Sequence, residues 1–348
     1  MKFLIFGGPG IGDTIIEMTL AKGLKSNYPK AEVYLILSDS LGTFGVVQSL
    51  LKCQDYIDDC YFYSRRHILS TFFTLQKLRQ KRIDYAFACS SSFKANSIPS
   101  KICSIIKCAC VMKKVKTVTN KSSFVVDIPE NINIVKQYEM LLNFLVPEGK
   151  LDIEVINADY IKDCVDIAVG KRGLITICLG TNITIYKRNN KRIKKNIKEW
   201  DVFNWCELAN MLAQNGYNVV FIGGEKEKNC LNKLELSLHP LVNSKLIGNT
   251  SIKESLSIIE KSILVIGADT GMMHCAAALG RKTISLFGGT PAEVWHPYSS
   301  RNYVIKGNVD CAPCYGKDYA IDCSKRICMS SITVITVFDY AIRIAENK

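Results

Sequence analysis

Residues 263–287 constrain the fold of this chain more than any other segment, because they read as a strand, a polar turn, a short helix and a second strand. The apolar run that opens this segment ends at Gly267, and the small residues that follow allow a helix to begin at once. The backbone N–H groups of Thr270 and Gly271 would then point out of the helix start, where they favour a bound phosphate. The alternative is that Asp269 and Thr270 only cap the helix.

Strands and helices alternate along the chain in two series. The strand-like segments lie at residues 2–6, 32–37, 84–89, 174–178, 218–222, 263–266 and 283–287. Helices are expected between them, beginning with one from Asp13 to Lys25. This pattern predicts an α/β fold with two parallel-sheet domains in tandem, and the length of 348 residues suits two domains. We place the domains at residues 1–160 and 161–330, followed by a C-terminal helix within residues 331–348.

The hydropathy of the chain argues against a membrane-spanning protein. Hydrophobic residues make up 48% of the sequence, but no apolar run approaches the length of about 18 residues that a membrane span needs. The first strand is broken at Gly7, Gly8 and Pro9, too early for the apolar stretch of a signal peptide. We therefore expect a cytoplasmic protein.

The chain contains 15 cysteines. Most are scattered through apolar runs, which favours buried free thiols in a reducing compartment over a secreted disulfide framework. Four lie together in one turn-rich segment, namely Cys311, Cys314, Cys323 and Cys328. They have the ligand count of a tetrahedral zinc site, although the second pair is spaced more widely than usual. We expect reduced thiols or a reversible disulfide here, and zinc is the weaker alternative.

The net charge of +13 is unevenly placed. Residues 60–116 carry 12 lysines and arginines against one acid, Asp84. Such a surface attracts polyanions, but no nucleic-acid-binding motif is evident, so nucleic acid is not an expected partner. Phe72 and Phe73 interleave with the cations as on an interfacial helix, which favours an anionic lipid headgroup or a phosphorylated saccharide. The alternative is an ordinary solvated basic surface.

Three stretches of the sequence resemble one known family. The first is Asp269-Thr270-Gly271-Met272-Met273-His274, followed by an Ala-rich helix and Phe287-Gly288-Gly289-Thr290. The second is the opening strand with its Gly12-Asp13 turn, and the third is Ser91-Ser92-Phe93-Lys94. Together they resemble the heptosyltransferase family, glycosyltransferase family nine. The resemblance implies two facing Rossmann-like domains in the glycosyltransferase-B arrangement, with the C-terminal helix packed back onto the first domain.

The turn before Asp13 invites a dinucleotide-binding interpretation, but the GxGxxG fingerprint that starts at Gly8 requires glycine at position 13. A carboxylate at this helix start would repel a pyrophosphate, whereas the helix dipole stabilises its charged form. In the resembling family this aspartate is the candidate general base, so Asp13 is expected to deprotonate the acceptor hydroxyl. A role as helix N-cap is the structural alternative.

The resemblance assigns the donor nucleotide sugar to the second domain. The expected donor-binding residues are Thr181, Lys198, Glu225, Asp269, Thr270, Gly271 and His274. Lys198 matches a family lysine that meets the diphosphate, although Lys194 and Lys195 are rivals for that role. Glu227 is the rival of Glu225 for the ribose hydroxyls. A satisfied core position is the alternative for His274.

The resemblance assigns the acceptor to the basic first domain, where the expected acceptor-binding residues are Arg79, Arg82, Ser92 and Lys94. It implies an inverting glycosyltransferase that takes ADP-L-glycero-D-manno-heptose as donor and an anionic lipid-linked saccharide, the lipopolysaccharide inner core, as acceptor. Peripheral contact with the inner membrane surface is expected with such an acceptor.

No Asp-x-Asp motif is present, so neither a metal clamp nor a cofactor is expected. Lys198 and the helix start at Thr270 would then meet the charge of the leaving group. Two other functions stay open. One is a noncatalytic protein that binds nucleotides or anionic glycolipids, and the other is an NAD-dependent oxidoreductase, which Asp13 and the two equivalent domains disfavour.

Overall fold

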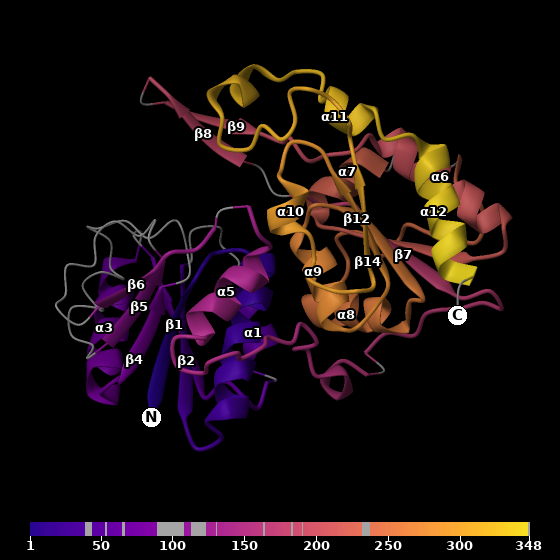
Figure 1. Cartoon of the computed structure of the whole chain (residues 1–348). Helices are drawn as coiled ribbons and strands as arrows, with labels where there is room; N and C mark the ends of the chain where they lie inside the picture. Colours follow the sequence, from indigo (N-terminus) through magenta and orange to yellow (C-terminus); the bar gives the residue numbers. More distant parts are fainter. Residues whose placement is uncertain are drawn as a thin grey trace. The chain divides into compact units, whose positions relative to one another are not determined.

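The computed structural model describes residues 1–38, 44–52, 54–64, 67–88, 108–112, 123–129, 131–162, 164–181, 184–189, 191–231 and 237–346. The chain divides into two compact units, Met1–Asn157 and Ala158–Lys348. Each unit is a parallel sheet with helices packed on it (Figure 1). The predicted fold class, α/β with two Rossmann-like domains, is therefore confirmed.

The first unit is built on a six-stranded parallel sheet in the order β3-β2-β1-β4-β5-β6. Its strands are β1 Lys2–Gly7, β2 Glu32–Ser38, β3 Asp59–Tyr63, β4 Tyr85–Ala88, β5 Cys108–Met112 and β6 Ser123–Val126. Its helices are α1 Ile11–Asn27, α2 Phe44–Leu51, α3 Ile68–Lys81 and α5 Ile134–Leu142. The direction of winding reverses between β1 and β4, and such switch points are where open α/β sheets usually bind their ligands.

Helix α1 starts directly above this switch point. It begins at Ile11, two residues before the predicted start, because Gly10 takes the extended conformation of an N-cap (φ −94°, ψ 156°). Asp13 therefore lies in the first turn and is not the N-cap. Helix α1 is buried on all sides from Thr14 to Ala21, and it packs against β1, β2 and α5.

The second unit repeats the architecture with the strand order β11-β10-β7-β12-β13-β14, all parallel. Its strands are β7 Leu174–Cys178, β8 Thr184–Arg188, β9 Lys191–Lys195, β10 Asn218–Ile222, β11 Val242–Asn243, β12 Leu264–Ala268, β13 Thr283–Phe287 and β14 Asn302–Lys306. Its α-helices are α6 Val202–Gln214, α7 Glu225–Leu231, α8 Ile252–Lys261, α9 Gly271–Ala278, α10 Ala292–Trp295, α11 Ile327–Ser330 and α12 Val334–Glu346. Short 3₁₀ helices lie at Ala158–Tyr160 and Asp318–Asp322. The switch point of this sheet lies between β7 and β12.

The two faces of the second sheet carry different helices (Figure 1). Helices α8 and α9 pack together on one face, and α6 and α12 pack together on the other. The core on the α6 side includes Trp200 and Trp205, whose rings meet edge to face at 4.6 Å between centroids. The indole N–H of Trp200 donates to the Ile332 carbonyl at 3.0 Å, just before α12. The predicted C-terminal helix is thus α12, and its contact with the first domain stays a prediction.

A two-stranded antiparallel hairpin, β8–β9, was not expected from the sequence. Lysines and arginines dominate residues 187–195, so the hydropathy pattern does not indicate strands there. In the register of the hairpin, Tyr186 of β8 nevertheless lies opposite Ile193 of β9. Tyr186 is buried in a small apolar cluster with Ile197 and Cys314, and Ile193 packs against this cluster. The hairpin therefore fixes the chain just before Lys198.

Candidate functional site

The start of α9 lies at the switch point of the second sheet, directly after β12. Thr270 is the N-cap residue, with extended backbone angles (φ −142°, ψ 156°), and its side chain makes no capping hydrogen bond. The structure therefore does not support capping as the role of the Thr270 hydroxyl. A helix start of this kind presents backbone N–H groups and the positive end of the dipole, which together suit an anion.

A partly buried ion pair lies at this helix start. The Lys198 ammonium is 2.8 Å from Oδ2 of Asp269, and the two side chains are only 17% and 8% exposed. Asp269 comes from the end of β12, whereas Lys198 comes from the loop between β9 and α6. The pair therefore holds a lysine ammonium beside the N–H groups of α9, as donor binding would need.

Asn196 links two other predicted donor residues. Its Oδ1 accepts a hydrogen bond from the Thr181 hydroxyl at 3.0 Å and another from the Lys198 backbone N–H at 3.3 Å. The structure thus brings Thr181, Lys198 and Asp269 together from three separate segments. Nothing in the sequence pattern singles out Asn196, because its role depends on the position of the loop that follows the hairpin.

His274 lies one turn into α9 and is 5% exposed. Burial lowers the pKa of His274 to about 4, and the neighbouring Asp269 opposes this shift only in part, while Lys198 and His296 add to it. The imidazole is therefore neutral at physiological pH. Its Nδ1 has no hydrogen-bond partner within the described part of the chain, so the ring is not a fully satisfied core group.

The two candidate glutamates after β10 lie in different surroundings. Oε2 of Glu227 accepts the Gly224 N–H at 2.8 Å, and a Cβ added to Gly180 would lie 3.4 Å from the Glu227 carboxylate. Glu227 therefore faces the end of β7, next to Thr181. Glu225 instead lies against Gly248, where an added Cβ would be 2.6 Å from its Oε2. The geometry favours Glu227, the rival in the sequence analysis, as the acidic residue nearest to Thr181.

Asp13 occupies the corresponding position in the first unit, at the start of α1. Its carboxylate accepts the Gly10 N–H at 3.1 Å. The preceding turn closes tightly over it, since a Cβ on Gly8 or Gly10 would lie 2.6 or 2.9 Å from Asp13 Oδ2. At Gly8 the added Cβ would also lie 2.9 Å from the Asp13 Cβ, so glycine at this position allows the turn to approach the helix closely.

The predicted acceptor residues are only partly described. Arg79 and Arg82 are exposed at the carboxyl end of α3, where Arg82 takes a left-handed conformation (φ 53°) and ends the helix. Ser92 and Lys94 lie outside the described residues. On the same helix Phe72 and Phe73 are 52% and 63% exposed, with their rings 6.0 Å apart. Cations and exposed aromatic rings thus share α3, as the sequence predicts.

The four clustered cysteines are free thiols. Burial raises the pKa of Cys314 to about 11, and the neighbouring Cys328, Cys323 and Cys311 add to the shift. The four cysteines are therefore close in space. Within the described residues, no group of three or more histidine, cysteine, aspartate or glutamate side chains is arranged to hold a metal ion.

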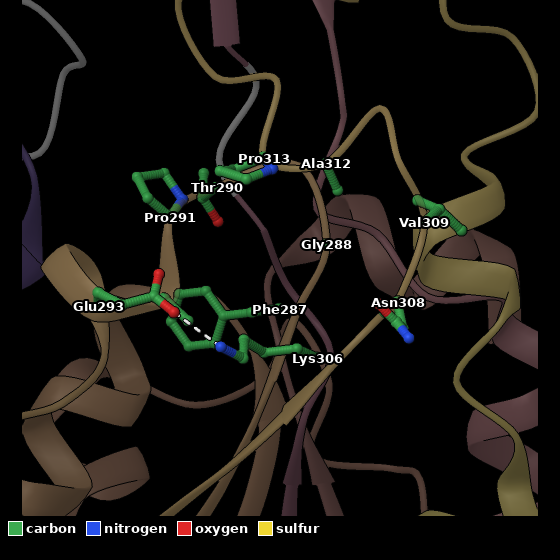
Figure 2. A pocket seen from close by; sticks show the side chains of 12 residues that line it. Phe287, Gly288, Thr290, Pro291, Glu293, Lys306, Asn308, Val309, Ala312 and Pro313 are labelled. Atoms are coloured by element: carbon green, nitrogen blue, oxygen red, sulfur yellow. Dashed lines mark hydrogen bonds and ion pairs between the residues drawn. The ribbon is translucent and has the colours of Figure 1, made fainter.

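A hollow of about 420 Å³ opens at the carboxyl ends of β13 and β14 (Figure 2). Lys306 and Glu293 form an ion pair at 2.7 Å along its wall. Thr290 also lines it and is 3% exposed, with no partner for its hydroxyl among the residues that the structure describes. None of the seven predicted donor-binding residues lines this hollow, whereas Phe287, Gly288 and Thr290 of the family-like strand end do.

Among the described helices, none is both long and apolar enough to cross a membrane.

Comparisons with known proteins point to one family. Residues 73–324 match the model of glycosyltransferase family 9 (heptosyltransferase). Lipopolysaccharide heptosyltransferase 2 of Salmonella typhimurium is 24% identical over 324 residues, covering 88% of each chain.

Solved structures share the fold. The E. coli ADP-heptose lps heptosyltransferase II superimposes with a TM-score of 0.73 at 20% identity, covering 99% of this chain and 98% of that chain. The E. coli heptosyltransferase WaaC with ADP-2-deoxy-2-fluoro heptose gives a TM-score of 0.73 at 13% identity, covering 99% of each chain. These likenesses confirm the glycosyltransferase-B fold.

Proposed function

This chain belongs to glycosyltransferase family 9, the heptosyltransferases, and from that premise we propose that it transfers heptose from ADP-L-glycero-D-manno-heptose to the lipopolysaccharide inner core. Family membership supports a glycosyltransferase acting in lipopolysaccharide synthesis. The choice of donor is supported by the relatives, since one is named for ADP-heptose and another was solved with an ADP-heptose analogue.

The observation that carries the donor proposal is the Lys198–Asp269 pair at the start of α9. The ammonium of Lys198 has three donors, of which Asp269 engages one side. We expect the remaining donors and the first N–H groups of α9 to bind the diphosphate. The interactions of the Lys198 ammonium and of these N–H groups would strengthen as the leaving diphosphate gains negative charge. They would therefore stabilise the transition state more than the ground state.

The nucleoside end of the donor would extend from this helix start toward β10. We propose that Glu227, which lies beside Gly180 and Thr181, accepts hydrogen bonds from the ribose hydroxyls. His274 would contribute as a neutral imidazole, because burial lowers its pKa to about 4. Thr181 would lie next to the diphosphate, and its O–H, which donates to Asn196 in this structure, would have to turn to a phosphate oxygen when the donor binds.

On the acceptor side, we propose that Asp13 is the general base of an inverting displacement. Its carboxylate is only half-buried at the helix start and is anchored by the Gly10 N–H, so it can face an acceptor hydroxyl in a fixed orientation. Arg79 and Arg82 would hold the phosphorylated saccharide, while Phe72 and Phe73 would contact the lipid surface that carries it. Such an acceptor places the enzyme at the cytoplasmic face of the inner membrane.

A thermal-shift panel tests the donor assignment. The protein is heated with ADP, ADP-heptose and matched GDP-, UDP- and dTDP-sugars, because a ligand that binds only the native state raises the unfolding temperature. We expect selective stabilisation by ADP and ADP-heptose. Equal or greater stabilisation by another nucleotide would contradict the proposal.

A further inference from the structure

Glu17 is a buried carboxyl one helical turn from Asp13 on α1. Its side chain is 0% exposed, and the Gly8 N–H donates to its Oε1 at 2.7 Å. Its Oε2 lies against Gly7, where an added Cβ would overlap it. The same glycine-rich turn therefore closes over two acids, Asp13 near its end and Glu17 beneath it.

The surroundings of Glu17 offer little support for a negative charge. Among the described residues, no lysine or arginine forms an ion pair with it, and Oε2 lacks a hydrogen-bond partner of good geometry. Two ionisable groups face the carboxyl, Asp13 on the same helix and Tyr138 on α5. Burial raises the pKa of Glu17 well above its ordinary value, and the charge of Asp13 raises it further. The Gly8 N–H and the Tyr138 hydroxyl lower the pKa, but by less.

The other elements packed on α1 do not change this balance. Helix α2 has no ionisable side chain, and Leu37 of β2 lies near Gly7. On β1 the one ionisable group is Lys2, at the opposite end of the strand, where it pairs with Glu32.

We propose that Glu17 is a positioning residue that holds the turn before Asp13, and that it does so as a neutral carboxylic acid. Its Oε1 fixes Gly8 through the N–H···O bond, while Gly10 at the other end of the turn donates to Asp13. Because Glu17 is neutral in this state, Asp13 keeps its own negative charge with no like charge one turn away. The inference rests on the proposed function of Asp13 as the general base.

Two substitutions separate positioning from charge. Glu17→Gln keeps an acceptor oxygen for Gly8 and is neutral at every pH, whereas Glu17→Ala removes the acceptor. We expect Glu17→Ala to lower turnover by roughly tenfold or more with unchanged ADP affinity, because a small displacement of a catalytic group is enough for that loss. Glu17→Gln should restore turnover to within about threefold of the wild-type value at neutral pH.

The pH dependence identifies the neutral form. A pKa raised in the folded state means that the stability from Glu17 is fully present below its ordinary pKa of 4.5 and is lost as the pH rises through the folded value. As the pH rises above about 5, the unfolding temperature of the wild type should therefore fall progressively below that of Glu17→Gln. Turnover of the wild type should fall at alkaline pH through a limb that Glu17→Gln lacks.

Glu139→Gln on α5 is the matched control. Glu139 is also buried, and burial opposes its charge. The hydrogen bonds from Lys136 and the Leu151 N–H, together with the positive charges of Lys136 and Lys150, outweigh burial and lower its pKa. Its replacement should reduce stability at neutral pH and leave the alkaline limb of turnover unchanged.

The outcomes are distinct. If Glu17→Gln matches the wild type in both pH profiles, Glu17 is not a neutral acid and the inference is overturned. Normal turnover in a folded Glu17→Ala protein would remove the positioning role, and if that variant does not fold, the Glu17→Gln profiles still decide. A wild type without any glycosyl transfer would refute the proposed function instead, while the stability profile would still report the protonation of Glu17.

Discussion

At the scale of single residues, the Lys198–Asp269 pair differs from the surface ion pairs of this chain. Its side chains are 17% and 8% exposed, whereas Lys306 and Glu293 are 59% and 57% exposed. Exposed pairs contribute little to stability, but removing one partner of a less exposed pair leaves a charge without compensation. Lys198 compensates the charge of Asp269, and under the proposed function it would also bind the donor, so the two roles can be tested separately.

Lys198→Ala should weaken binding of ADP by about 1.5–3 kcal/mol, the range for hydrogen bonds to charged groups. The variant should also unfold at a lower temperature, because Asp269 loses its partner. Calorimetric titration with ADP and a thermal melt measure the two effects. Lys194→Ala on β9 tests the rival lysine: if it weakens ADP binding as much as Lys198→Ala does, the assignment of Lys198 is wrong.

Asp13→Asn should lower turnover by roughly 100-fold or more with little change in donor affinity. Asparagine keeps the size of the side chain and an oxygen for the Gly10 N–H, but it cannot take a proton. Steady-state kinetics gives turnover, and titration with ADP gives donor affinity. Near-normal turnover in this variant would remove Asp13 from the role of base.

At the scale of secondary-structure elements, α3 combines exposed cations with exposed aromatic rings. Reversing two charges, Arg79→Glu with Arg82→Glu, should raise the acceptor KM and weaken its dependence on salt, since screened attraction to an anion is lost. The KM for the nucleotide sugar should not change. The result that would contradict this division of labour is a raised donor KM in the double variant.

The aromatic pair on α3 makes a different contribution. Phe72→Ser with Phe73→Ser should raise the KM for an acceptor embedded in anionic vesicles but not for a delipidated acceptor, because only the former requires contact with a lipid surface. An equal effect on both acceptors would indicate that the rings bind the saccharide and not the membrane.

Elements with continuous apolar runs could be predicted from the sequence, and others could not. Strands β7, β10 and β13 lie where the sequence places them, because burial on both faces selects uninterrupted apolar residues. The hairpin β8–β9 could not be predicted, because lysines and arginines dominate its sequence and obscure the alternation of apolar and polar residues that indicates a strand. The start of α1 was misplaced by two residues, since the extended conformation of Gly10 leaves no mark in the hydropathy pattern.

The site shows the same division. Asp269, Thr270 and His274 lie within six consecutive residues after β12, so the sequence alone suffices to predict that they are close together. The positions of Asn196 and Glu227 next to Thr181 depend on contacts between loops that are distant in sequence. No local sequence pattern predicts these contacts. Glu17 was missed because its position on a helix predicts an ordinary solvated acid, whereas the turn above it encloses the side chain.

At the scale of the whole molecule, the two units repeat one architecture with different site chemistry. Each sheet has a switch point capped by a helix start, but the first helix start holds the carboxylate Asp13 while the second is paired with the cation Lys198. An inverting displacement needs a base toward the acceptor and positive charge toward the leaving diphosphate. Under the proposed function, Asp13 of the first unit and Lys198 of the second unit would meet these two requirements.

The most direct test of this account measures the product of transfer. The protein is incubated with an inner-core acceptor lacking terminal heptose and, in turn, with ADP-heptose or matched GDP-, UDP- and dTDP-sugars. Mass spectrometry of the acceptor detects any added sugar. The account predicts addition of a heptose from ADP-heptose with release of ADP, in the wild type and not in Asp13→Asn. Transfer from a different nucleotide sugar, or no transfer from ADP-heptose by folded wild-type protein, would contradict it.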